Sequence, residues 1–104
     1  MKILLDECVP LTLKRYLIGH RVQTAQQAGF SGYKNGRLLQ AAEVEFDLLI
    51  ISDKNLQYQQ NLASRKIAIL ILSTNHRPVI EEKSGKILQA INRMAPREFL
   101  ELEI

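Results

Sequence analysis

With 104 residues the chain has room for one hydrophobic core, so we expect a single domain over residues 1–104. Its composition is 46% hydrophobic and 24% charged, which is typical of a globular protein and excludes an intrinsically disordered chain. The formal net charge of +3 is compatible with a polyanionic partner such as RNA, although a merely solvated surface explains the same charge.

Membrane and disulfide signals are absent from the sequence. The longest apolar stretch, residues 67–72, is too short to cross a bilayer, and the apolar run near the N-terminus is broken by Asp6 and Glu7. We therefore expect a cytoplasmic protein with no membrane partner. The lone cysteine, Cys8, has no second cysteine to pair with and no histidine near it in sequence, so we interpret it as a small buried residue.

Strand-like and helix-like segments alternate along the chain, which predicts an α/β domain with helices on both faces of a mostly parallel sheet of four to five strands. In chain order we expect a strand at 3–5, a helix at 10–18, a strand at 20–24, a loop at 29–36, a helix at 37–47, a strand at 48–51, a short helix at 55–62, a strand at 67–72, a helix at 79–94 and an edge strand at 99–104. The strands at 3–5, 48–51 and 67–72 are apolar runs without alternation, so we expect them to be adjacent, parallel and buried on both faces.

Acidic residues follow two of these strands at the point where each strand ends. Asp6 and Glu7 follow the first strand, and Asp53 follows the strand at 48–51. In a parallel sheet these positions share one edge, where clustered carboxylates repel one another unless a cation lies between them. Mg²⁺ or Mn²⁺ suits such oxygen ligands, activates water and neutralises the charge on a phosphodiester. The pattern predicts a metal-dependent nuclease; the alternative is that each Asp only caps a helix.

Residues 55–62 combine several amide side chains with one aromatic ring. Tyr58, Gln60 and Asn61 are candidates for binding single-stranded bases by stacking and edge hydrogen bonds. The alternative is an exposed polar helix with Tyr58 and Leu62 packed on the core.

Three cations lie near the proposed acids in sequence and are candidates for holding phosphates. They are Lys34, Arg37 and Lys54, although Lys54 can equally pair with a neighbouring acid. Glu43, on the helix at 37–47, can face either the proposed site, where it would help the acids, or solvent, and Glu45 close by in sequence favours solvent.

Four short motifs in register suggest a family. They are residues 4–10 (Leu-Leu-Asp-Glu-Cys-Val-Pro), 19–22 (Gly-His-Arg-Val), 34–36 (Lys-Asn-Gly, followed by Leu38 and Leu39) and 52–62 (Ser-Asp-Lys-Asn-Leu-Gln-Tyr-Gln-Gln-Asn-Leu). In order and spacing they resemble a bacterial PIN-like family of largely unknown function, related to the toxin ribonucleases of type II toxin–antitoxin modules.

The resemblance implies a three-layer α/β/α PIN-like fold with a Mg²⁺- or Mn²⁺-dependent site that cuts RNA. Asp6 matches the first acid of such sites and Asp53 a later one. Asn35, Arg37 and Asn55 stand where many relatives carry acids; an Asn carbonyl can still bind a metal, whereas Arg cannot. The resemblance also implies a cognate antitoxin protein as a partner, and a homodimer.

Our first hypothesis is therefore a metal-dependent endoribonuclease, the toxin of a two-gene module. Asp6, Glu7 and Asp53 would be catalytic, with Asp6, Asp53 and Asn55 as metal ligands and Asn35 among the substrate-binding residues. The second hypothesis is an inactive PIN-like module that binds RNA or a protein partner. A third, an unrelated receiver-like or nucleotide-binding domain, fits the acids but lacks a glycine-rich phosphate loop after the first strand.

Overall fold

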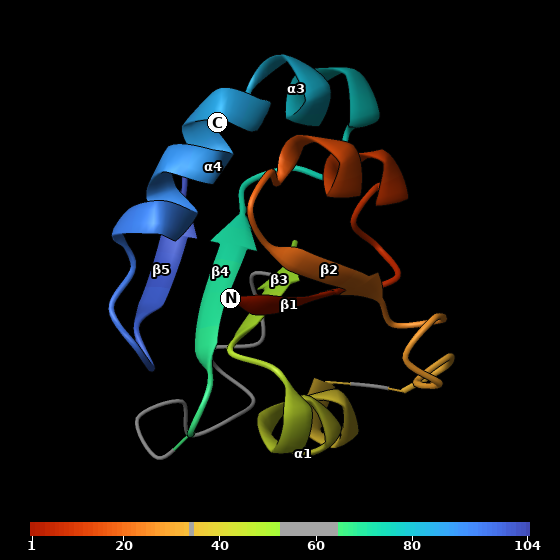
Figure 1. The fold of residues 1–104 in the computed structure, drawn as a ribbon. Helices are drawn as coiled ribbons and strands as arrows, with labels where there is room; N and C mark the ends of the chain where they lie inside the picture. The colour runs from red at the N-terminus through yellow and green to blue at the C-terminus, as the bar shows by residue number, and fades with distance from the viewer. Residues whose placement is uncertain (34, 53–64) are drawn as a thin grey trace.

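The computed structural model of the chain describes residues 1–33, 35–52 and 65–104 (Figure 1). Within these residues a sheet of five strands runs in the order β2-β1-β3-β4-β5, and every neighbouring pair is parallel. The strands are β1 (Lys2–Leu5), β2 (Arg21–Thr24), β3 (Leu48–Ile51), β4 (Ala68–Leu72) and β5 (Phe99–Leu102). The predicted adjacency of β1, β3 and β4 is confirmed, and the described sheet is wholly parallel.

The burial of the strands follows their composition. Every residue of β3 and β4 is buried, as expected for apolar runs covered on both faces. In β5 exposed and half-buried residues alternate, and only β4 pairs with it, which confirms the predicted edge strand. The sequence therefore separates the central strands from the edge strand by hydrophobic pattern alone.

Helices cover both faces of the sheet, which makes the described structure a three-layer α/β arrangement (Figure 1). One face carries the 3₁₀ helix η1 (Leu11–Tyr16) and the helices α3 (Arg77–Glu82) and α4 (Ser84–Arg93). The other face carries α1 (Asn35–Glu45). Alternation along β1 serves both layers, because Ile3 and Leu5 join the first core and Leu4 joins the second.

The segment predicted as a helix at 10–18 is the 3₁₀ helix η1. The Leu13 N–H donates to the carbonyl of Pro10 at 3.1 Å, the short-range bond of a 3₁₀ turn, and the element spans only six residues. Gly19, with φ of 89°, then turns the chain toward β2. The helix predicted at 10–18 is thus confirmed in place, as a shorter 3₁₀ helix.

Other helix boundaries also differ from prediction. The segment expected as one helix at 79–94 is split into α3 and α4 at Lys83, which precedes the weak helix formers Ser84 and Gly85. α1 begins at Asn35 rather than Arg37. The Asn-Gly pair, which usually indicates a turn, therefore lies in the first turn of the helix. The helix predicted at 55–62 lies outside the described residues.

No helix within the described ranges combines the length and the apolar character that a bilayer span requires.

Candidate functional site

The candidate site lies where the sheet changes direction. From β1 the chain goes to β2 on one side and later returns to β3 on the other side, so the carboxyl ends of β1 and β3 form a switch point, the usual ligand position in open α/β sheets. Asp6 follows β1 here, and its N–H donates to the carbonyl of Ile50 in β3 at 3.0 Å. On the side of β2, the N–H of Ala25 donates to the carbonyl of Leu5 at 2.8 Å. The backbone under Asp6 is therefore fixed by both neighbouring strands.

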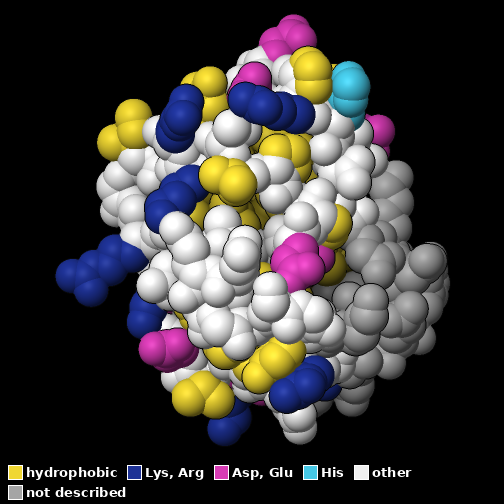
Figure 2. Space-filling model, turned by 90° about the vertical axis from the view of Figure 1, so that its right-hand side faces the viewer, with side chains coloured by type: hydrophobic (Ala, Val, Ile, Leu, Met, Phe, Trp, Pro, Cys, Tyr) yellow, Lys and Arg dark blue, Asp and Glu magenta, His cyan; other side chains and the backbone are white. Residues whose placement is uncertain are grey.

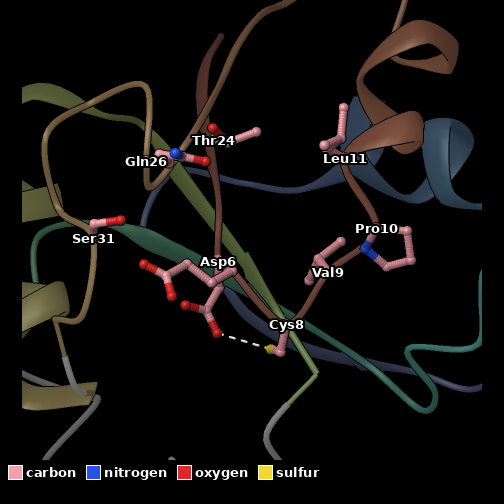
Figure 3. A pocket seen from close by; sticks show the side chains of 9 residues that line it. Asp6, Cys8, Val9, Pro10, Leu11, Thr24, Gln26 and Ser31 are labelled. Carbon is pink, nitrogen blue, oxygen red and sulfur yellow. Dashed lines mark hydrogen bonds between the residues drawn. The ribbon is translucent and has the colours of Figure 1, made fainter.

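A cavity of about 440 Å³ opens beside Asp6 (Figure 3). It is lined by residues from the end of β1, the start of η1 and the segment after β2, namely Asp6, Glu7, Cys8, Val9, Pro10, Leu11, Thr24, Gln26 and Ser31. The predicted acids Asp6 and Glu7 thus both lie at a cavity at the carboxyl edge of the sheet.

Asp6 is tied to the end of β3 by a chain of hydrogen bonds. The thiol of Cys8 donates to Oδ2 of Asp6 at 2.8 Å, and the hydroxyl of Ser52 donates to Sγ of Cys8 at 3.1 Å (the first of these is drawn in Figure 3). Partial desolvation, followed by the hydrogen bond to the Asp6 carboxylate, raises the pKa of the Cys8 thiol, and the bonds to Ser52 offset part of this rise. The ends of β1 and β3 therefore meet at one carboxylate.

The expectation that Cys8 is a buried residue is wrong, because the residue is exposed. After β1 the chain makes a turn in which the N–H of Val9 donates to the carbonyl of Asp6 at 3.0 Å. This turn places Val9 in the core, with 4% of its surface exposed, and leaves Cys8 at the rim of the site.

Glu7 has a structural contact as well as a place at the cavity. Its Oε1 accepts the N–H of Gly32 at 2.8 Å and so ties the loop after β2 to the end of β1. Gly32 has φ of 79°, which favours glycine at this position. The loop predicted at 29–36 is confirmed up to residue 33, and it forms one wall of the site.

Arg37, a predicted phosphate ligand, lies in the first turn of α1 with its guanidinium 3.9 Å from the ring centre of Tyr33. Tyr33 in turn stacks on Phe30 at 5.3 Å. Arg37 is exposed but does not line the cavity. On the face shown in Figure 2, Lys and Arg side chains are spread among Asp and Glu rather than gathered into one basic patch.

Several predicted site residues lie outside the described part of the chain. These are Lys34, Asp53, Lys54, Asn55, Tyr58, Gln60 and Asn61, and for Asn35 only the backbone is described. The described residues contain no group of three or more His, Cys, Asp or Glu side chains placed to share a metal ion. Of the predicted metal ligands, Asp6 is the one that the structure describes.

Glu43 does not face solvent as expected. Its Oε1 accepts the N–H of Lys66 at 3.2 Å and lies 3.6 Å from a guanidinium nitrogen of Arg65. Both partners precede β4, so Glu43 lies at the amino edge of the sheet, opposite the candidate site. These two contacts anchor the chain before β4.

The residues that line the cavity opposite Asp6 are not among the site residues predicted from the sequence. Thr24 and Gln26 come from the end of β2 and the turn after it, and Ser31 comes from the loop that Glu7 holds. The signal that points to them is topological, because residues after β2 share the carboxyl edge with those after β1.

The arrangement offers a carboxylate at a switch point beside a cavity, which suits the binding of a cation together with a small polar ligand. Comparison of the chain with protein-family models, with curated proteins and with solved structures found no match.

Proposed function

We propose that the chain is a metal-dependent endoribonuclease with a PIN-like fold, in which Asp6 and Asp53 bind Mg²⁺ or Mn²⁺ and water attacks a phosphodiester of RNA. The observation that carries this proposal is the position of Asp6, at the switch point of a parallel sheet and at a cavity of about 440 Å³. Sites of this kind at the carboxyl edge of α/β sheets bind ligands.

The second ligand in the proposal is supported by the contacts of Ser52. The hydroxyl of Ser52 reaches Cys8, and the thiol of Cys8 reaches Asp6, so the end of β3 is part of the site. Asp53 is the next residue in the sequence. An acid at this position is the natural partner for Asp6 in holding a divalent ion.

The charges of the site favour a cation when RNA binds. Asp6 and Glu7 line the cavity, and a phosphodiester carries a further negative charge, so substrate and site repel each other without a positive ion. A bound Mg²⁺ or Mn²⁺ would lower the pKa of a water molecule and neutralise charge on the phosphate. Asp6 would hold the ion, and Glu7, through Gly32, would keep the cavity wall in place.

The proposal includes the biological role implied by the PIN-like resemblance, that of a toxin whose partner is an antitoxin protein. It also includes a homodimer paired through β5, whose outer edge has no partner strand among the described residues. A small gene next to this one, whose product suppresses toxicity of this chain on co-expression, would support the toxin role.

A second candidate is a PIN-like module that binds RNA or a protein without cutting. It is favoured by the protein contacts of both acids, because Asp6 accepts the Cys8 thiol and Glu7 accepts the Gly32 amide. Each carboxylate therefore has a structural function that needs no metal.

Cleavage of labelled single-stranded RNA with Mn²⁺, and with EDTA as a blank, separates the two candidates. Asp6→Asn and Asp53→Asn should each abolish cleavage, because the negative charge of the metal ligand is lost. The matched control is Asp47→Asn, since Asp47 accepts the N–H of Lys2 at 2.8 Å and is remote from the site. Metal-dependent cleavage that survives Asp6→Asn, or no cleavage by the wild type, would refute the enzyme proposal.

A further inference from the structure

The cavity beside Asp6 has two chemically different sides, as Figure 3 shows. Val9, Pro10 and Leu11 form an apolar side at the start of η1. Thr24, Gln26 and Ser31 form a polar side from β2 and the loop after it. The acidic end of β1 lies between them. A ligand that fills this space must therefore have an apolar surface and a polar edge.

The polar side has hydrogen-bonding groups to spare. The Gln26 amide and the Ser31 hydroxyl have no hydrogen-bond partner within the described residues, whereas the Thr24 hydroxyl accepts the N–H of Gln27 at 3.1 Å. A glutamine side chain offers a donor and an acceptor side by side. This pattern matches the edge of a nucleobase, where donors and acceptors are also adjacent.

The apolar side offers a surface for a flat ring. Leu11 has 68% of its surface exposed although it lines the cavity, and Pro10 next to it is half-buried. Contact with a ring would remove this apolar surface from water, which favours binding. The volume of about 440 Å³ lies within the range of small-ligand pockets.

The charge of the described lining residues disfavours a phosphate in the interior of the cavity. The described residues that line it include Asp6 and Glu7 but no Lys or Arg. An anion placed there would be repelled by the carboxylates, whereas a neutral ring would not. The neutral part of a nucleotide therefore suits the interior, and its phosphate suits the rim, where Asp6 is placed to hold a metal ion.

We infer that this cavity is a subsite for one unpaired base of RNA, adjacent to the phosphodiester that is cut, with Gln26 and Ser31 reading the base edge and Leu11 contacting its ring. This inference rests on the proposed function. The base must be unpaired, because in a duplex its edge is occupied and its faces are stacked.

The first test is titration of the metal-free wild-type protein with uridine, cytidine, adenosine and guanosine, followed by NMR. At least one nucleoside should shift the amide signals of Gln26 and Ser31. Its 5′-monophosphate should bind about fivefold more weakly, because the added charge meets the carboxylates without a cation. The absence of any shift at these residues with all four nucleosides would overturn the inference.

Variants on each side of the cavity provide the second test. Gln26→Ala and Leu11→Ala should each weaken nucleoside binding about fivefold, which corresponds to ~1 kcal/mol. The controls are Gln40→Ala, an exposed glutamine on α1, and Ile18→Ala, an exposed aliphatic residue just after η1; neither lines the cavity, and neither should change binding.

The outcomes separate the inference from the proposed function. If the protein cuts RNA with Mn²⁺, but Gln26→Ala and Leu11→Ala bind nucleosides and cut RNA like the wild type, the base subsite is wrong and the nuclease stands. If nucleosides bind at Gln26 and both variants weaken that binding, while no RNA is cut, the cavity is a base-binding site, but the nuclease and the position of the site next to a cut phosphodiester are wrong.

Discussion

Replacing Cys8 with alanine tests the hydrogen-bond chain that joins β1 to β3. The change removes the donation from the thiol to Asp6 at 2.8 Å and the donation from Ser52 to the sulfur at 3.1 Å. A hydrogen bond contributes about 0.5–1.5 kcal/mol to stability, and a thiol at an exposed site belongs at the low end. The two bonds together should therefore contribute about 1 kcal/mol to stability. Their loss in Cys8→Ala should lower Tm by roughly 4–8 °C in a domain of this size.

Thermal unfolding of the metal-free protein, followed by circular dichroism, measures this loss. Cys8→Ser is the matched control, because its hydroxyl can still donate to Asp6 and accept from Ser52, so it should retain most of the stability. If Cys8→Ala is as stable as the wild type, or if Cys8→Ser loses as much as Cys8→Ala, the hydrogen-bond chain does not hold the two strand ends together.

Three further predictions concern charges. Asp6→Asn should lower the raised pKa of the Cys8 thiol, which is measured from the pH dependence of thiol alkylation. In the wild type, the stability that the protonated thiol provides should be lost as pH rises through this raised pKa. Arg77→Ala should raise the pKa of Glu81, measured by NMR titration, because the Arg77 side chain donates a hydrogen bond to Glu81 at 3.1 Å and lowers that pKa. The stability associated with this contact is present above the ordinary carboxyl pKa and is lost as pH falls through the lowered pKa of Glu81. Glu43→Ala should reduce Tm but leave RNA cleavage unchanged, since Glu43 anchors the opposite edge of the sheet.

The sheet could be predicted because its signal is local. The runs at 48–51 and 67–72 are apolar at every position, and only a strand covered on both faces needs such a pattern. The placement of Asp6 at the carboxyl edge followed from the same reasoning, since a parallel strand delivers the residue after it to that edge.

The errors arose where tertiary contacts override local pattern. Nothing in the sequence around Cys8 shows that a turn moves it out of the core and gives Val9 the buried position. The orientation of Glu43 depends on the chain before β4, which is distant in sequence. Gln26 and Ser31 carry no motif, and only the folded path of the loop after β2 brings them to the cavity.

The most direct test of the proposed metal site is NMR of the protein with substoichiometric Mn²⁺, whose unpaired electrons broaden the signals of nearby residues. Broadening should be centred on Asp6 and Cys8, should be lost in Asp53→Asn, and should persist in the control Asp47→Asn. Broadening centred at another part of the sheet, or broadening around Asp6 that Asp53→Asn leaves unchanged, would contradict a metal ion shared by Asp6 and Asp53.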